Sequence, residues 1–341
     1  MHVGIIGHGV WLPSTFMSAA DIARATGIPE DVIALKFGVK HKPISGPDET
    51  TAVMGLRAAL RALSVAGISG SDVDLVIWCG AQHKDYPCWL AGLYVADKIG
   101  AKNAWSFDME AMCGSMMVAL DVAKSLLLAR DDLQTVLLVS GYRNNDLIDL
   151  REAATRFMLD IGSGASALVL RKNAGRNAVY ASAFRGDGSF SEMCVVPTLG
   201  SKAWPPSPGD ELRAHFVVPD EEAFKNKLND LTLPNFYAVI RESLQRSCLS
   251  NAEIDYLAIL HFKKSAHDAV LKELGLGPSN TTYLEDYGHL GQNDQVLSLE
   301  LGLAAGKVRD GSTVVFVGAG LGFVWAATVI KWGPVTESLR Q

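Results

Sequence analysis

The chain has 341 residues, which is long for one ordinary domain and fits two units of about 170 residues. It is 48% hydrophobic and 20% charged, and it contains 32 glycines, a profile typical of a well-packed α/β enzyme and not of a disordered or fibrous chain. The net charge of −6 argues against a nucleic-acid-binding protein, because such proteins usually have a basic face.

The cysteines and the apolar runs indicate the cellular compartment of the protein. No uninterrupted apolar run reaches the roughly 18 residues that span a bilayer, and residues 1–7 lack a basic leader, so they predict a strand and not a signal peptide. The cysteines are odd in number, and no two have Cys-x-x-Cys spacing. We therefore expect neither a disulfide framework nor a metal site, no membrane span, and a cytoplasmic location.

The first half of the chain alternates helical and strand patterns. An Ala- and Leu-rich segment, 52–66, predicts a helix, and 73–78 predicts a buried strand that begins next to Asp74. A second helix is expected to end at Gly100, and Cys113 follows thirteen residues later. An apolar helix over 116–128 and a buried strand over 135–141 complete this half.

The same order returns in the second half. A helix near 236–248 precedes an apolar strand over 254–260, a helix ends at Gly275, and His289 follows fourteen residues later. An apolar helix over 296–305 then leads to a strand over 313–318. These offsets predict a duplicated α/β unit with mostly parallel core strands, divided into an N-terminal half, 1–175, and a C-terminal half, 176–341.

One segment interrupts the repeat. Residues 200–227 contain a Trp-Pro-Pro-Ser-Pro-Gly run, which is incompatible with a regular helix or a central strand. We expect a loop excursion there, in a position to cover a pocket.

Cys113 is the candidate nucleophile. It lies between a predicted strand and a predicted helix, where the positive end of the helix dipole and unpaired N–H groups favour the thiolate. Most free cysteines are buried structural residues, so this position alone leaves that alternative open. The other cysteines, Cys79, Cys88, Cys194 and Cys248, are interpreted as structural.

Two histidines are candidate partners of Cys113. His261 follows an apolar strand, at the end where α/β folds bind ligands, although a surface-turn histidine would fit the same position. His289 occupies the repeat position equivalent to Cys113. Pseudo-symmetry therefore predicts that His289 and Cys113 face each other at the centre of the molecule.

A glycine turn, 318–322, follows the last predicted buried strand. Glycines there let backbone N–H groups approach a ligand closely, as an oxyanion hole requires. The turn superficially matches a dinucleotide-binding fingerprint, but a strand follows it instead of a helix, and no acidic ribose partner lies about 20 residues further on.

Several motifs together resemble ketoacyl-acyl-carrier-protein synthase III of the thiolase superfamily. The likeness runs over nearly the whole chain. Its parts are the Leu-Pro turn that ends 4–13, the surroundings of the nucleophile in 107–114, the Asp-Ile-Gly-Ser-Gly-Ala segment 160–165, the Tyr-Gly-His motif 287–289, and the Gly-Leu-Gly-Phe-Val-Trp motif 320–325.

The resemblance implies a thiolase-like fold, layered α-β-α-β-α, with pseudo-two-fold halves. It implies acyl-coenzyme A or acyl-carrier-protein thioesters as substrates and no separate cofactor. It also implies the following site residues: Cys113, His261 and His289 for catalysis; the backbone of Cys113, Gly320, Leu321 and Gly322 for the oxyanion; and Lys36, Tyr86 and Lys264 for substrate binding.

The sequence departs from that family at its site. The family has Asn at the third catalytic position, and the Cys-His-His combination found here is similar to that of the elongating ketosynthases. Near the coenzyme A entrance, the family's Trp-Ile-x-x-Arg reads Val32-Ile33-Ala34-Leu35-Lys36, so a specialised or protein-carried donor is expected.

The family also implies a homodimer. The resemblance assigns the dimer contact to the strand Thr135–Ser140, and it makes 83–87 the loop that reaches the neighbour's pocket.

The expected reaction is a decarboxylative condensation. Cys113 accepts an acyl group, and a malonyl-type thioester then supplies an enolate that both histidines stabilise. Two alternatives remain open at this point. One is transfer of the acyl group to an alcohol or amine with His289 as general base, and the other is a silent partner subunit of a heteromeric synthase.

Overall fold

The computed structural model describes residues 1–80, 82–198 and 200–335, so the end of the second predicted half, 336–341, lies outside the described residues. Nine strands form one large mixed sheet. In sheet order they are β5 (Trp105–Met109), β4 (Leu75–Cys79), β6 (Thr135–Tyr142), β7 (Gly164–Lys172), β1 (Val3–Trp11), β8 (Arg176–Gly186), β11 (Val324–Pro334), β10 (Thr313–Gly320) and β9 (Tyr256–Ile259).

The order of strands contains the duplication predicted from the sequence. β4 pairs in parallel with β6, and β6 pairs antiparallel with β7; β9 pairs in parallel with β10, and β10 pairs antiparallel with β11. The same side-chain contact stabilises the start of both parallel pairs. The Asp74 carboxylate accepts a hydrogen bond from the Thr135 N–H at 2.8 Å, and the Asp255 carboxylate accepts one from the Thr313 N–H at 2.7 Å.

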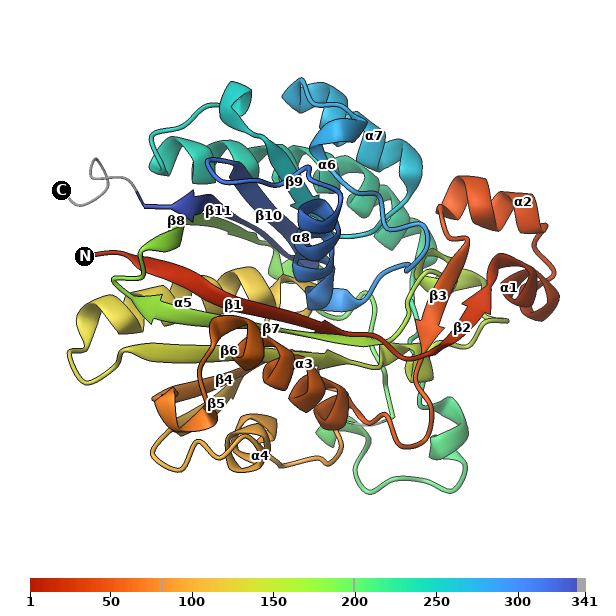
Figure 1. The fold of residues 1–341 in the computed structure, drawn as a ribbon. Coiled ribbons are helices and arrows are strands. Elements are labelled where there is room, and N and C mark those ends of the chain that lie inside the picture. The colour runs from red at the N-terminus through yellow and green to blue at the C-terminus, as the bar shows by residue number, and fades with distance from the viewer. Residues whose placement is uncertain (81, 199, 336–341) are drawn as a thin grey trace.

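Helices cover both faces of the sheet and separate its halves (Figure 1). α3 (Thr51–Ala66) and α4 (Ala91–Lys98) pack on the outer face of the first half, and α6 (Glu221–Arg246) packs on the outer face of the second and contacts α7 (Lys264–Leu274). α5 (Ser115–Ala129) and α8 (Asp294–Ala304) contact strands of both halves. This is the layered α-β-α-β-α arrangement of a thiolase-like fold.

Alternating side chains of the strands explain these layers. In β4, Leu75 and Ile77 pack with α5, whereas Val76 and Trp78 pack with α3. In β10, Val314 points to the inner layer with α5. Strands that are buried on both faces read as continuous apolar runs, which is why the sequence predicted these strands well.

A small lobe stands at one end of the sheet (Figure 1). It contains the two-stranded sheet of β2 (Thr15–Ser18) and β3 (His41–Ile44) with α1 (Ala19–Thr26), α2 (Glu30–Val32) and a π-helical turn, Ile33–Phe37. The lobe lies at the carboxyl end of β1. Because β1 and β6 both pair antiparallel with β7, and β4 pairs in parallel with β6, the carboxyl ends of β4 and β6 lie at this same end of the sheet. It therefore borders the edge where ligands bind in α/β folds.

The stretch Met112–Ala129 is long and apolar enough to cross a membrane by composition alone. It contains Asp121 and Lys124, and half of it is buried in the protein. Its contacts with strands of both halves are those of a core helix.

Three sequence-based expectations are wrong. The core strands are not mostly parallel, because five of the eight neighbouring pairs in the large sheet are antiparallel and only the pairs of β4 with β5 and β6 and of β9 with β10 are parallel. The loop predicted over 200–227 ends early, because α6 begins at Glu221, where the Asp220 carboxylate accepts a hydrogen bond from the Ala223 N–H at 2.9 Å. The strand Thr135–Ser140 has no free edge for a dimer contact, because it belongs to β6, which pairs with β4 on one side and with β7 on the other. The terminal strand on that side of the sheet is β5.

Candidate active site

Cys113 lies where the chain enters the central helix. It is in a short 3-10 turn, Met112–Gly114, directly before α5, and it is 9% exposed. The preceding Met112 has a φ of 48°, which is uncommon for a residue with a side chain and is characteristic of functional turns. The sulfur therefore sits at the positive end of a 15-residue helix while remaining accessible.

His289 faces Cys113, as the pseudo-symmetry predicted. Its Nε2 is 3.2 Å from the Cys113 Sγ. Its backbone is fixed from the other half of the molecule: the His289 N–H donates to the Asp160 carbonyl at 2.9 Å, and the Gly162 N–H donates to the His289 carbonyl at 3.0 Å. The Asp-Ile-Gly segment of the family motif thus holds the histidine backbone in place.

Asp294, which the sequence did not single out, lies behind His289. Its carboxylate accepts hydrogen bonds from His289 Nδ1 at 2.6 Å, from the Leu290 N–H at 2.7 Å, and from the His261 N–H at 2.7 Å. Its side chain is fully buried. A signal was present in the sequence, because an acidic residue opens the apolar helix α8, whereas its repeat counterpart α5 opens with Ser115-Met116-Met117.

His261 is at the centre of the site but has other partners. Its Nδ1 is 2.8 Å from the Asp160 carboxylate, and its Nε2 is 3.0 Å from the Gly38 carbonyl oxygen. Both partners are acceptors, so both contacts are hydrogen bonds only when the ring carries a proton on each nitrogen. The His261 ring is thus held between the Asp160 carboxylate and the Gly38 carbonyl, and its Nε2 faces the small lobe.

Burial and charge act in opposite directions on the pKa of His289. Burial lowers this pKa, but the charges of Asp294 and Cys113, with their hydrogen bonds, outweigh that effect and raise it well above the usual value. Burial, followed by the nearby charges of Cys113 and Asp294, raises the pKa of Tyr142 well above its usual value. Tyr142 is therefore a neutral phenol beside the nucleophile.

Lys42 is a second buried group that the sequence did not reveal. Its Nζ donates to the carbonyls of Leu159 at 2.8 Å and Ile161 at 2.7 Å. Burial lowers the pKa of Lys42 to about 8, and Asp160 partly offsets that effect. Its hydrogen bonds hold the two residues on either side of Asp160, the partner of His261.

The glycine turn packs against the nucleophile. A Cβ added at Gly320 would lie 2.3 Å from the Ala111 carbonyl oxygen and 3.0 Å from the Cys113 backbone N. Only glycine permits this approach. The turn predicted over 318–322 is shorter and later in the structure, because β10 continues to Gly320 and only Leu321, Gly322 and Phe323 connect it to β11. The strand predicted after the turn is confirmed.

The three predicted substrate-binding side chains lie at the surface. Lys36 is exposed on the π-helical turn that packs beside α7, and Lys264 begins α7, where it pairs with Asp268. Tyr86 is 65% exposed and contacts the ring of Trp89 edge-on. The structure therefore brings Lys36 and Lys264 onto adjacent elements and places Tyr86 on the loop after β4.

The remaining cysteines differ from Cys113. Burial raises the thiol pKa of Cys79 and of Cys194 to about 12, which makes both unreactive near neutral pH. Cys88 and Cys248 are exposed. No group of three or more metal-ligating side chains occurs in residues 1–80, 82–198 and 200–335.

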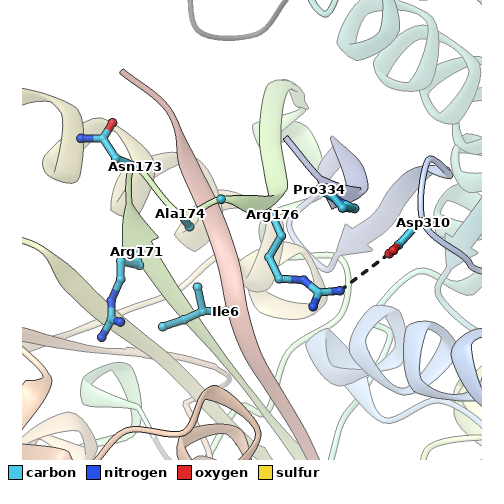
Figure 2. A pocket seen from close by; sticks show the side chains of 8 residues that line it. Ile6, Arg171, Asn173, Ala174, Arg176, Asp310 and Pro334 are labelled. Atoms are coloured by element: carbon cyan, nitrogen blue, oxygen red, sulfur yellow. Dashed lines mark ion pairs between the residues drawn. The ribbon is translucent and has the colours of Figure 1, made fainter. Parts of the chain in front are cut away.

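A surface hollow lies at the opposite end of the sheet (Figure 2). It is lined in part by Ile6, Arg171, Arg176, Asp310 and Pro334, and Arg176 and Asp310 are 3.7 Å apart. These residues surround the start of β8 and the end of β11, so the hollow is separate from Cys113.

Known proteins match the chain over its length. Residues 107–188 match the family model of 3-oxoacyl-[acyl-carrier-protein] synthase III, and 244–332 match the model of its C-terminal part. The β-ketoacyl-[acyl-carrier-protein] synthase III of Paramagnetospirillum magneticum is 26% identical over 334 residues, which are 96% of this chain and 98% of that protein.

Solved structures agree on the fold. A 3-oxoacyl-(acyl carrier protein) synthase III from Pseudomonas aeruginosa aligns with a TM-score of 0.85 at 23% identity, over 98% of this chain and 100% of that one. The priming β-ketosynthase of a polyketide biosynthetic pathway has the same TM-score and identity, over 98% of this chain and 97% of that one.

Proposed function

Because the chain belongs to the thiolase superfamily as a ketoacyl-acyl-carrier-protein synthase III-like condensing enzyme, we propose that it carries an acyl group on Cys113 and joins that group to a malonyl-type thioester. The observation that carries this proposal is the position of the Cys113 Sγ, at the start of α5 and 3.2 Å from the His289 Nε2. The intact nucleophile disfavours a silent partner subunit.

The first half-reaction loads the enzyme. The Cys113 thiolate attacks the carbonyl carbon of an acyl thioester, the bond from that carbon to the carrier sulfur breaks, and the carrier leaves as a thiol with a proton taken from solvent. The backbone N–H of Cys113 and the turn 320–322 support the oxyanion, since Gly320 packs against the Cys113 backbone.

The second half-reaction forms the carbon–carbon bond. The malonyl-type thioester loses carbon dioxide, its enolate attacks the acyl carbon, and the Cys113 sulfur leaves as a thiolate. His289 donates to the developing enolate oxygen through Nε2, which holds the proton taken from Cys113, while its Nδ1 stays bound to Asp294. For His261 to act as the second donor, the thioester oxygen replaces the Gly38 carbonyl at its Nε2.

A second candidate reaction is transfer of the acyl group to a hydroxyl or amine. The observation in its favour is that His289 lies between Cys113 and a buried carboxylate, the arrangement of a general base. Incubating the acyl-enzyme with a malonyl thioester and measuring carbon dioxide separates the two reactions. Release in step with product supports condensation, and product without release supports transfer.

Five finer properties belong to this proposal. The substrates are acyl-coenzyme A or acyl-carrier-protein thioesters, no separate cofactor takes part, and the free cysteines suit a reducing cytoplasm.

Lys36 and Lys264 contact the carrier or its pantetheine arm, because the π-helical turn and α7 pack together. The protein is a symmetric homodimer joined along β5, a terminal strand of the sheet, where Trp105 is 41% exposed; Tyr86, on the loop after β4, is 65% exposed.

A further inference from the structure

We propose that Asp294 is the positioning residue of this site: its carboxylate fixes the ring of His289 with Nδ1–H inward, so that Nε2 exchanges a proton with the sulfur of Cys113. This inference rests on the proposed role of Cys113 as nucleophile. It assigns a function to a side chain outside the Cys-His-His set that the sequence suggested.

The contacts of Asp294 show more than an ordinary helix cap. One carboxylate oxygen accepts from both the His289 Nδ1 and the His261 N–H, and the other accepts from the Leu290 N–H. The carboxylate thus joins the end of β9, which carries His261, to the turn that carries His289. A cap requires only the backbone contacts, whereas the ring contact, at 2.6 Å, is the shortest of the three.

The ring contact determines which proton can move. Because a carboxylate accepts only, Nδ1 carries the hydrogen, and in the neutral ring Nε2 has a free lone pair toward Cys113. The proton leaves Sγ for Nε2, which gives a thiolate and an imidazolium, and the Asp294 carboxylate stays unprotonated. The arrangement is that of a Cys-His-carboxylate triad.

The other ionisable groups around His289 do not provide this contact. The Asp160 carboxylate is bound to His261, and Asp160 contacts His289 only through its backbone. Lys42 binds backbone carbonyls. The Tyr142 ring lies 6.1 Å from the His289 ring and is held neutral by burial. Asp294 is therefore the carboxylate that holds the ring.

The first test measures Cys113 reactivity without any acyl substrate. Alkylation of Cys113 by iodoacetamide is followed by peptide mass spectrometry from pH 5 to 10 in the wild type, Asp294→Asn, His289→Gln and the double variant. In Asp294→Asn, the midpoint of the plot of Cys113 alkylation rate against pH rises by about one pH unit or more, because the negative charge of Asp294 no longer stabilises a protonated His289.

The controls separate positioning from folding. Asp255→Asn, at the other end of β9, removes a carboxylate that caps a strand backbone, and it leaves the Cys113 profile unchanged. If Asp294 acts through His289, adding Asp294→Asn to His289→Gln changes the profile no further. An unchanged midpoint in folded Asp294→Asn, or additive effects in the double variant, overturns the proposal.

A second measurement uses only folded wild type and His289→Gln. In a ¹⁵N-histidine NMR spectrum, the resonances of His289 are identified as those that disappear in His289→Gln. We expect their chemical shifts to show a protonated Nδ1. A neutral Nε2–H tautomer contradicts the proposal even if Asp294→Asn fails to fold. Failure of the proposed function gives a different result, because Cys113 then forms no adduct with acyl thioesters while its alkylation profile stays as described.

Discussion

His289 and His261 are both histidines, but their side chains lie in different environments. His289 lies between a thiol and the Asp294 carboxylate, and one of its nitrogens can gain or lose a proton at Cys113. His261 has acceptors at both nitrogens, the Asp160 carboxylate and the Gly38 carbonyl. The two are therefore not interchangeable, and substitutions at each should have different kinetic effects.

Replacing His289 distinguishes the two candidate reactions. If His289 donates to the enolate, His289→Asn restores the donor of the resembled family and retains measurable condensation. His289→Ala should lose roughly 100-fold or more in turnover, the scale of one lost oxyanion donor. Steady-state rates with carbon dioxide release test this. If Asn is as inactive as Ala while acyl-Cys113 accumulates, transfer to a hydroxyl or amine is the better description.

The raised pKa of His289 also predicts how stability depends on pH. The folded state holds this proton more tightly than the unfolded chain, whose histidine titrates near about 6.5. The resulting stabilisation is complete below that pH and is lost as pH rises through the higher folded value. Urea unfolding at pH 6 and pH 9 should show that the free energy of unfolding falls more between these two pH values in the wild type than in His289→Asn. Equal losses would contradict the assignment.

The turn between β10 and β11 is the element that fits most closely to the nucleophile. Gly320→Ala would place a methyl group 2.3 Å from the Ala111 carbonyl oxygen, so the turn must move away from Cys113. We expect acylation of Cys113 to slow roughly 100-fold, the scale of a misplaced oxyanion donor. Gly200→Ala, where an added Cβ meets nothing within 4 Å, is the matched control. Full activity in Gly320→Ala would exclude a role for this turn.

The sequence predicted the elements whose signal is local. Strands buried on both faces are continuous apolar runs, and the offsets of Cys113 and His289 located the repeat. The start of α6 was missed because the cap at Asp220 follows a proline-rich segment that obscured it. Lys42 and Tyr142 were missed because their partners are distant in sequence and meet them only in the folded chain. Asp294 lies only five residues after His289, but an acidic residue at the start of a helix is also expected for an ordinary cap, so the sequence did not separate the two roles.

At the scale of the whole molecule, the duplication places the site between the halves. Cys113 and Asp160 come from the first half, and His261, His289 and Asp294 come from the second. The two halves share the inner layer of α5 and α8. Neither half alone contains a nucleophile together with its histidine, so activity requires the intact chain.

The sheet has two terminal strands, β5 and β9, and the proposed dimer is joined along β5. Trp105 lies on β5 and is 41% exposed, stacked on Phe107. Trp105→Glu should convert the dimer to a monomer in sedimentation velocity at micromolar concentration, because a charge at a dimer interface is costly to bury. Trp204→Glu, at a tryptophan that is 78% exposed and lies on a surface loop away from β5, should leave the proposed dimer intact. A wild-type monomer would refute the assembly.

The most direct test of the central claim is the intact mass of the protein after incubation with a panel of acyl-coenzyme A and acyl-carrier-protein thioesters. We predict the mass of one acyl group per chain, located by peptide mapping on Cys113 and absent in Cys113→Ala. An adduct that persists in Cys113→Ala, or no adduct with any thioester of the panel, would contradict the account.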